Sequence, residues 1–464
     1  MPSTRSCRQG GWWRALTGGL LALTALAPPR PAWPQPLAIT VESGVQLALE
    51  HHEDLQVARA RVDAAHLGVR AARADLLPQV TAAVGYTRNW VLPSIVFNDQ
   101  ALKLGSDNSA SGSLTLRQSL YAGGRNGAAL GAARHRLEAG GEQRRAVEQE
   151  TRARVESAVY DYLLAGEMVR VSQLRLDLAR TSLSQAQALR RVGRAPEYDV
   201  IRANVLVASA RTDSIAAAND LNLAGVYLRD AIGLDLERAI EVVARFRATT
   251  ALPVHDAGAL VRLALTRRPD WLELRAQLAA AQSQVGVARA GSRPSLSLSA
   301  SGQMQFQNDK LDVLTHGREW RRSWSTGIAL QVPVFDGWRT GAQVGQARVE
   351  VKALEVRLQQ LERDLELQVR AAQLELGEAG ERLEVQRGVV DEAGRGLAIA
   401  QARYGTGAGT HLEVLDAQVT VVQARSAYAR AQRDRAVALV AVERAVGVLG
   451  HLAAPNEGAA PSGG

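Results

Sequence analysis

Residues 295–306 read SLSLSASGQMQF, and apolar and polar side chains alternate through this segment with a period of two. Alternation of this kind is typical of a β-strand that has one apolar face and one hydrated face. The apolar face would carry Leu296, Leu298, Ala300, Met304 and Phe306. A tilted strand of about 9–11 residues is long enough to cross a bilayer. The segment therefore predicts an amphipathic strand of membrane length.

Three further segments, at about 79–90, 112–121 and 324–335, show the same strand-like pattern, and aromatic residues gather at the strand ends. Aromatic rings favour the interface between membrane and water. The edge of a soluble β-sandwich is the alternative interpretation. Four strands are too few to close a barrel, so a membrane sheet of this kind would have to pool strands from several copies of the chain.

An internal repeat organises the sequence. Residues 120–125 (LYAGGR) match residues 334–339 (VFDGWR), and residues 199–201 (DVI) match residues 413–415 (EVL), both at an offset of 214. A similar offset relates 72–78 to 288–294. Because the match extends over about 160 residues, we interpret the chain as a tandem duplication, with a period far longer than that of solenoid repeats.

The duplication divides the chain into two copies, at 37–233 and 256–450, joined by a connector at 234–255. Each copy is predicted to contain a helical stretch (41–77 and 256–292), two strands and a long helical hairpin (125–233 and 341–450). Residues 1–36 have the basic start and apolar run of a secretory signal peptide, with cleavage near residue 36. The Gly- and Pro-rich tail at 451–464 is predicted to be disordered.

Proline spacing and apolar periodicity predict unusually long helices. No proline lies between Pro93 and Pro196, or between Pro333 and Pro455, so nothing there breaks a helix. Apolar residues spaced 3, 4, 3 and 4 from Val351 to Leu365 form a coiled-coil seam. A helix over 339–404 would be roughly 100 Å long, which requires an elongated bundle or tube.

Several classes of function lack support in the sequence. The net charge is +8, but arginine and glutamate are interspersed and form no basic block, so we expect no nucleic-acid partner. Cys7, the only cysteine, lies in the predicted signal peptide, which leaves no cysteine for metals or disulfides in the mature chain. No catalytic or phosphate-binding motif occurs, and the scattered histidines are interpreted as structural or exposed. We expect neither an enzyme nor a cofactor. After the signal, no run of about 18 apolar residues predicts a transmembrane helix.

Together these features resemble the TolC-like outer membrane efflux protein family, the outer membrane factors of tripartite efflux and type I secretion systems. Two motifs carry the resemblance. One is the turn from strand to helix, where Gly123, Gly124 and Gly337 would permit the change of direction. The other is the hairpin tip at 403–418, with its partner at 193–203.

The resemblance implies a fold that is mainly α with β. Long antiparallel hairpins would form a periplasmic α-barrel, and four strands from each chain of a homotrimer would form a twelve-stranded transmembrane β-barrel. It also implies a passive exit duct in the Gram-negative outer membrane, extending into the periplasm among outer membrane lipids. The implied partners are a periplasmic adaptor (membrane fusion) protein and an inner-membrane transporter of the RND or ABC type.

The resemblance also assigns residues to the periplasmic entrance. Glu413 and Asp416 fall where the family places acidic rings, and Tyr404 falls where it has a gate-locking tyrosine. Asp199 matches an acidic lock partner, whereas Gly409 stands where the family has a gate-locking arginine. Our hypothesis is that Arg202 pairs with Asp416 or Asp199 as the latch. Ordinary solvated positions for Glu413 and Asp416 remain the alternative.

A different class of function also fits part of the pattern. A periplasmic coiled-coil adaptor or scaffold would use long hairpins without forming a pore. Such proteins usually carry one hairpin flanked by β-domains, whereas this chain has two hairpins in tandem with strands of membrane length. The sequence therefore favours the channel.

Overall fold

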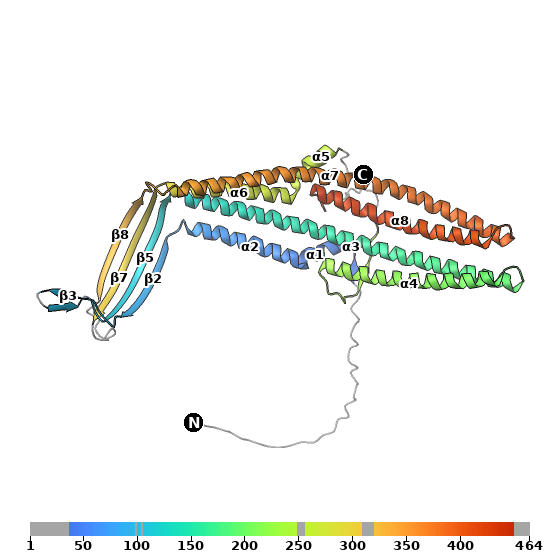
Figure 1. Ribbon diagram of the computed structural model, residues 1–464, viewed down its shortest axis with the longest axis horizontal. Coiled ribbons are helices and arrows are strands. Elements are labelled where there is room, and N and C mark those ends of the chain that lie inside the picture. Colours follow the sequence, from blue (N-terminus) through green and yellow to red (C-terminus); the bar gives the residue numbers. More distant parts are fainter. Residues whose placement is uncertain (1–36, 98–99, 104, 248–255, 309–319, 450–464) are drawn as a thin grey trace, which may run out of the picture.

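The computed structural model describes residues 37–97, 100–103, 105–247, 256–308 and 320–449. The predicted signal peptide and tail lie outside these residues, as does part of the connector. The molecule is elongated, with a curved sheet at one end and long helices extending away from it (Figure 1). Within the described residues, the helices contain no window of sufficient length and hydropathy to span a bilayer.

Two long hairpins dominate the fold, in the two proline-poor regions that predicted them. The first is α3 (Arg125–Arg191) followed by α4 (Glu197–Ile232), and the second is α7 (Arg339–Thr406) followed by α8 (His411–Val446). Helices α3 and α7 contain 67 and 68 residues. Residues 351, 354, 358, 361 and 365, which form the seam, are the less exposed positions of their part of α7, as their spacing predicted.

Each copy begins with a pair of helices, in the place where the sequence predicted one helical stretch (41–77 and 256–292). These are α1 (Val41–His51) and α2 (Glu53–Ala74), then α5 (Ala257–Arg267) and α6 (Pro269–Arg289), with a 3-10 turn at Ala290–Ser292. The breaks fall at His52 and Arg268, both extended, with ψ of 132° and 120°. Pro269 disfavours helical backbone at Arg268, and the His52 side chain accepts a hydrogen bond from the Asp54 amide.

Four antiparallel strands form the sheet, in the order β2-β5-β7-β8. They are β2 (Gln79–Arg88), β5 (Asn108–Ala122), β7 (Ser295–Asn308) and β8 (Arg321–Gln331). The predicted segment 324–335 was wrong at its end, because β8 stops at Gln331. Pro333 cannot donate a ladder hydrogen bond, which accounts for the early end.

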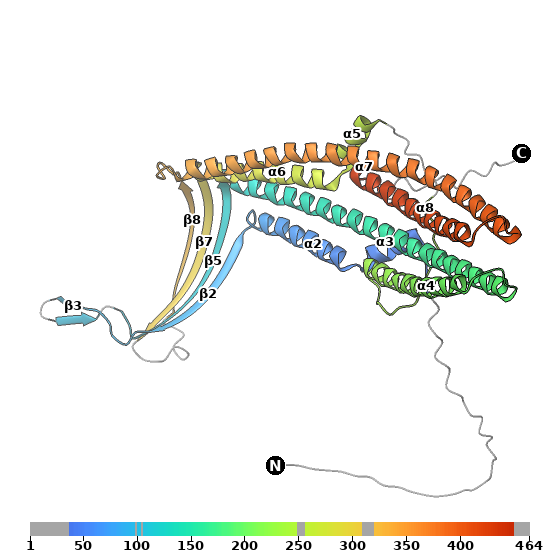
Figure 2. The same cartoon turned by 45° about the vertical axis from the view of Figure 1, so that its right-hand side comes forward.

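Two short strand pairs were not predicted. A hairpin of β3 (Ser94–Phe97) and β4 (Gln100–Lys103) projects beyond the far end of the sheet (Figure 2). The other pair joins β1 (Leu37–Ile39) and β6 (Ile240–Val242) in parallel near the middle of the molecule. Segments of three or four residues are too short for a period of two to stand out from chance.

The register of the sheet separates its two faces. Val80 pairs with Leu116, and Leu116 with Ala300; further along, Leu296 pairs with Leu330. Directly paired residues share a face, so the apolar rows of the four strands merge into one apolar face. The opposite face carries mainly Ser, Thr and Gln. A bulge in β5 leaves both Leu120 and Tyr121 opposite Leu296.

The helices continue the order of the strands. Helix α2 leads into β2, β5 into α3, α6 into β7, and β8 into α7. Neighbouring helices pack in the order α2-α3-α6-α7, which matches the sheet, and beyond the middle the order becomes α4-α3-α8-α7 (Figures 1 and 2). The result is a curved wall about one helix thick.

The hydrophobic core is thin and divided. One cluster packs Ile39, Val155 and Leu228 where α1, α3 and α4 meet. A second packs Leu260, Val369 and Val442 where α5, α7 and α8 meet. These two places are equivalent in the two copies. They hold the short helices α1 and α5 against the long hairpins.

Candidate functional site

The tip of the second hairpin is a tight turn stabilised by its own backbone. Gly407 has a left-handed backbone, with φ of +81°, and the Arg403 carbonyl accepts hydrogen bonds from the amides of Ala408 and Gly409. A Cβ atom added at Gly409 would lie 3.1 Å from the Arg403 Cβ and 3.1 Å from a Glu413 oxygen. The turn is therefore packed around a glycine, at the position where the resemblance would place a locking arginine.

Glu413 performs a local structural role. Its carboxylate accepts a hydrogen bond from the Thr410 amide at 3.4 Å, while the Thr410 hydroxyl accepts one from the Glu413 amide at 3.3 Å. This reciprocal pair is a capping box at the start of α8. Arg403 lies 3.7 Å from the same carboxylate. In this arrangement the charge of Glu413 is directed into the turn.

His411 is the residue at the tip that the sequence interpretation missed. It is the first residue of α8 and is only 8% exposed, and neither ring nitrogen has a hydrogen-bond partner. Its ring centroid lies 5.3 Å from that of Tyr404 on α7. Burial lowers its pKa; Arg202 lowers it further, and Asp199 opposes the shift. The Thr410-x-x-Glu413 spacing predicts the start of a helix, but no local signal shows that His411 is buried.

The structure places three of the predicted gate residues near this histidine. Asp199 and Arg202 come from the first turns of α4. Tyr404 comes from the last turn of α7, and its pKa is raised by burial and by Asp199. The sequence could place these residues at hairpin ends but could not show that α4 meets the start of α8.

Arg202 and Asp416 line one groove of about 370 Å³ between α3, α4 and α8. Most of the other groove residues are apolar, including Leu206, Leu415 and Val419. In the described part of the chain, Arg202 forms no ion pair within 4.0 Å with Asp416 or Asp199. The predicted latch between Arg202 and an acidic partner therefore stays a hypothesis. Arg202 and one of its two possible partners, Asp416, line the same groove.

Three polar contacts join the two hairpins along α3 and α8. A buried hydrogen bond at 2.9 Å connects Gln418 to the Ser182 hydroxyl. Arg433 lies 2.7 Å from the Asp161 carboxylate, and Arg444 lies 2.5 Å from that of Glu150. The hairpins are therefore tied to each other inside one chain, and the buried amide near the tip is the most costly of these contacts to leave unpaired.

A buried charged cluster lies where the connector crosses the two hairpins. Arg247 bonds Glu443 at 2.9 Å, and the preceding residue, Phe246, stacks on Tyr160 with ring centroids 6.2 Å apart. Glu156 lies in the same cluster, 5% exposed, with one carboxylate oxygen unpaired. Burial raises its pKa to about 7, although Arg247 acts in the opposite direction.

The two turns from strand to helix share one backbone conformation. Gly123 and Gly124 have φ of +63° and +87°, and Gly337 and Trp338 have φ of +66° and +68°. Trp338 is the only residue other than glycine with a positive φ among those described. Left-handed backbone costs a residue with a Cβ atom roughly 1–2 kcal/mol. The glycines therefore suit the turn, and Trp338 is strained.

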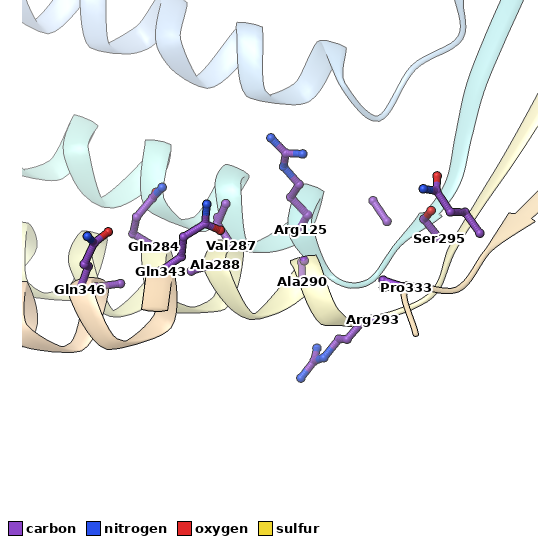
Figure 3. Close-up of a pocket in the computed structure, with 14 residues that line it drawn as sticks. Arg125, Gln284, Val287, Ala288, Ala290, Arg293, Ser295, Pro333, Gln343 and Gln346 are labelled. Carbon is purple, nitrogen blue, oxygen red and sulfur yellow. The ribbon is translucent and has the colours of Figure 1, made fainter. Parts of the chain in front are cut away.

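Beside these turns, a cavity of about 710 Å³ opens on the polar side of the sheet (Figure 3). Arg125 begins α3 at its edge, and Gln284, Gln343 and Gln346 line it from α6 and α7 (Figure 3). Ser295 and Gln331 contribute from the paired ends of β7 and β8. The polar face of the sheet thus continues into a polar surface on the helices.

Comparison with known proteins defines the class. The family model described as outer membrane efflux protein matches residues 44–234 and 260–448, once in each copy of the repeat. The chain belongs to the outer membrane efflux protein family. It is therefore an outer membrane channel with its helices in the periplasm, and it is not an enzyme.

Individual relatives extend over nearly the whole chain. The pyoverdine export outer membrane protein OpmQ of Pseudomonas aeruginosa is 30% identical over 448 residues, covering 94% of this chain and 90% of OpmQ. The outer membrane protein TolC of Vibrio cholerae is 25% identical, covering 87% of this chain and 89% of TolC. The crystal structure of VceC from Vibrio cholerae superposes with a TM-score of 0.76 at 21% identity, covering 88% and 96% of the two chains. This last likeness shows the fold.

Proposed function

We propose that the chain is the exit duct of a tripartite efflux or type I secretion system and acts as a homotrimer. The observation that supports this most is the separation of the sheet into an apolar and a polar face. An apolar outer face suits lipid, and a polar inner face suits a water-filled pore.

The open edges of the sheet support the proposed trimer. Strands β2 and β8 form the two edges and, within the described residues, each pairs on one side only. Unpaired backbone groups at an edge call for another strand. Pairing β8 of one copy with β2 of the next would close a twelve-stranded barrel from three copies. The helices, which keep the order of the strands, would then form a tube.

The location of the hairpin tips supports the proposed partners. The tips lie at the end of the molecule farthest from the sheet (Figure 1). A periplasmic adaptor and an inner-membrane transporter, of the RND or ABC type, would meet this end and deliver cargo into the tube. OpmQ is named for pyoverdine export. We infer from such relatives that this chain also exports a substrate chosen by its transporter.

Conductance of the purified protein in planar bilayers tests the proposal. A duct gives ion conductance, and the variant Asp416→Asn should lower cation preference if the acidic residues form rings at the entrance. Unchanged selectivity and closure in this variant would remove the ring hypothesis but leave the duct. A protein that never conducts and does not fractionate with the outer membrane would favour the periplasmic scaffold instead.

A further inference from the structure

A second cavity, of about 470 Å³, lies at the junction of β8 and α7, on the opposite side from the polar cavity. Val334, Phe335 and Trp338 line it from the turn, and Arg289 and Arg348 line it from α6 and α7. We refer to these five residues as the junction groove. None of them belongs to the hairpin tips or to the buried charged cluster.

The residues that line the two cavities show which way the groove faces. On α7, residues 343, 346 and 347 line the polar cavity, whereas residues 340, 341, 344 and 348 line the groove, so the two cavities lie on different faces of this helix. Ser295 and Gln331, which pair on the polar face, line the other cavity. The junction groove therefore opens on the same side as the apolar face of the sheet, at the end of the sheet nearest the helices.

The turn residues in the groove are unusually exposed. Val334 is 94% exposed, Phe335 75% and Trp338 80%, and the two rings meet edge to face with centroids 6.2 Å apart. Trp338 also has a strained backbone, whereas the equivalent residue of the first copy is Gly124. Strain combined with an exposed indole is unfavourable in water, but an indole is favoured at the headgroup level of a bilayer.

The groove carries two arginines without acidic partners. Among the described residues, neither Arg289 nor Arg348 has an acidic partner within 4.0 Å. Asp336 is the one carboxylate that lines the groove, and it accepts a hydrogen bond from the Thr340 amide at 2.9 Å. Two guanidinium groups beside an apolar surface complement a phosphate that is attached to acyl chains.

We propose that the junction groove binds the phosphate headgroup of an anionic phospholipid in the periplasmic leaflet of the outer membrane. Arg289 and Arg348 bind the phosphate, while Val334, Phe335 and Trp338 contact the first carbons of the acyl chains. The proposal rests on the proposed function in one respect, namely that the sheet crosses the outer membrane.

Native mass spectrometry of the detergent-purified protein with added phosphatidylglycerol tests the site. We expect the wild type to retain bound phosphatidylglycerol and the double variant Arg289→Gln/Arg348→Gln to retain at least tenfold less. The matched control is Arg211→Gln/Arg425→Gln, which removes two exposed arginines from α4 and α8 and should bind like the wild type. Equal retention by the two double variants would overturn the proposal.

Two further arms make the outcome specific. Phosphatidylethanolamine, which carries no net charge, should be retained less than phosphatidylglycerol, and equal retention would overturn the choice of an anionic lipid. Millimolar inorganic phosphate should not displace the lipid; complete displacement would show that the site takes a free anion. Trp338→Gly copies the backbone of the first turn, so it should fold normally yet lose lipid.

Conductance separates failure of this proposal from failure of the proposed function. The groove is remote from the hairpin tips, so Arg289→Gln/Arg348→Gln should conduct like the wild type in bilayers of neutral lipid. A conducting double variant with unchanged lipid retention refutes the groove alone. A wild-type protein without conductance refutes the duct.

Discussion

Substitution of Glu156 by glutamine should change how the stability of the protein depends on pH. Glu156 is buried beside Glu443, and Arg247 already bonds Glu443. A buried carboxyl in this position favours its neutral form, and burial raises its pKa from 4.5 to about 7. Glutamine is neutral at every pH and nearly the same size.

The direction in which stability changes with pH follows from which state of the protein binds the proton. Between pH 4.5 and 7 the folded protein holds a proton on Glu156 that the unfolded chain has released, so stability falls as the pH rises through this range. With a folded pKa of about 7, the total loss is about 3 kcal/mol. The Gln variant should lack this loss.

Thermal unfolding followed by circular dichroism, in detergent at pH 5 and pH 8, measures the effect. The difference in Tm between Glu156→Gln and wild type should be larger at pH 8 than at pH 5, by roughly 5 °C. Glu375→Gln, at an exposed position on α7, should show no such change with pH. An equal Tm difference at both pH values would refute the raised pKa of Glu156 in the folded protein.

Three other predictions test the fold and the tip. Gly233→Ala and Gly447→Ala should each lower the free energy of unfolding by about 1–3 kcal/mol, because both glycines have positive φ and a new Cβ would lie within 3.3 Å of backbone atoms. Gly380 has open space around it, so Gly380→Ala should instead raise the free energy of unfolding by about 1 kcal/mol. Thermal unfolding measures both effects. Gln418→Leu should lower the free energy of unfolding by about 1–3 kcal/mol, because it leaves the buried Ser182 hydroxyl unpaired. Adding Ser182→Ala should restore most of this stability. If the double variant is no more stable than Gln418→Leu, the hydrogen bond does not contribute to stability. The pKa of His411 is lowered below 6.5, so protonation of this buried ring in acid should destabilise the hairpin tip. The protection of the backbone amides at 404–412 against hydrogen exchange should therefore fall below pH 6.5 in the wild type. An equal fall in His411→Leu would contradict this.

Periodic patterns in the sequence predicted most of the architecture. The alternation at 295–306 and the seam from Val351 to Leu365 both report which side of an element is buried, so they placed a strand and a helix correctly. The repeat then extended these assignments to the other copy. The end of β8 was misplaced because alternation continues through Val332 and Val334, although Pro333 interrupts the ladder there.

The candidate sites depended on contacts between distant segments, which local patterns do not encode. Glu413 is the exception: the sequence analysis assigned it to an acidic ring or to a solvated position, whereas its capping contact is local and the Thr410-x-x-Glu413 spacing could have predicted it. Glu156, Arg247 and Glu443 come from three separate elements, and nothing in their local sequence indicates that they meet. Trp338 was visible as a departure from Gly124 in the repeat, but its backbone strain required the structure.

The number of chains in the assembly tests the account most directly, because the open sheet must be completed by other copies. Native mass spectrometry of the mature protein, extracted from outer membranes with detergent, should give the mass of three chains. Cysteines introduced on β2 and β8 should then crosslink neighbouring chains into a closed set of three. A stable single chain, with no crosslink between these strands, would contradict the account.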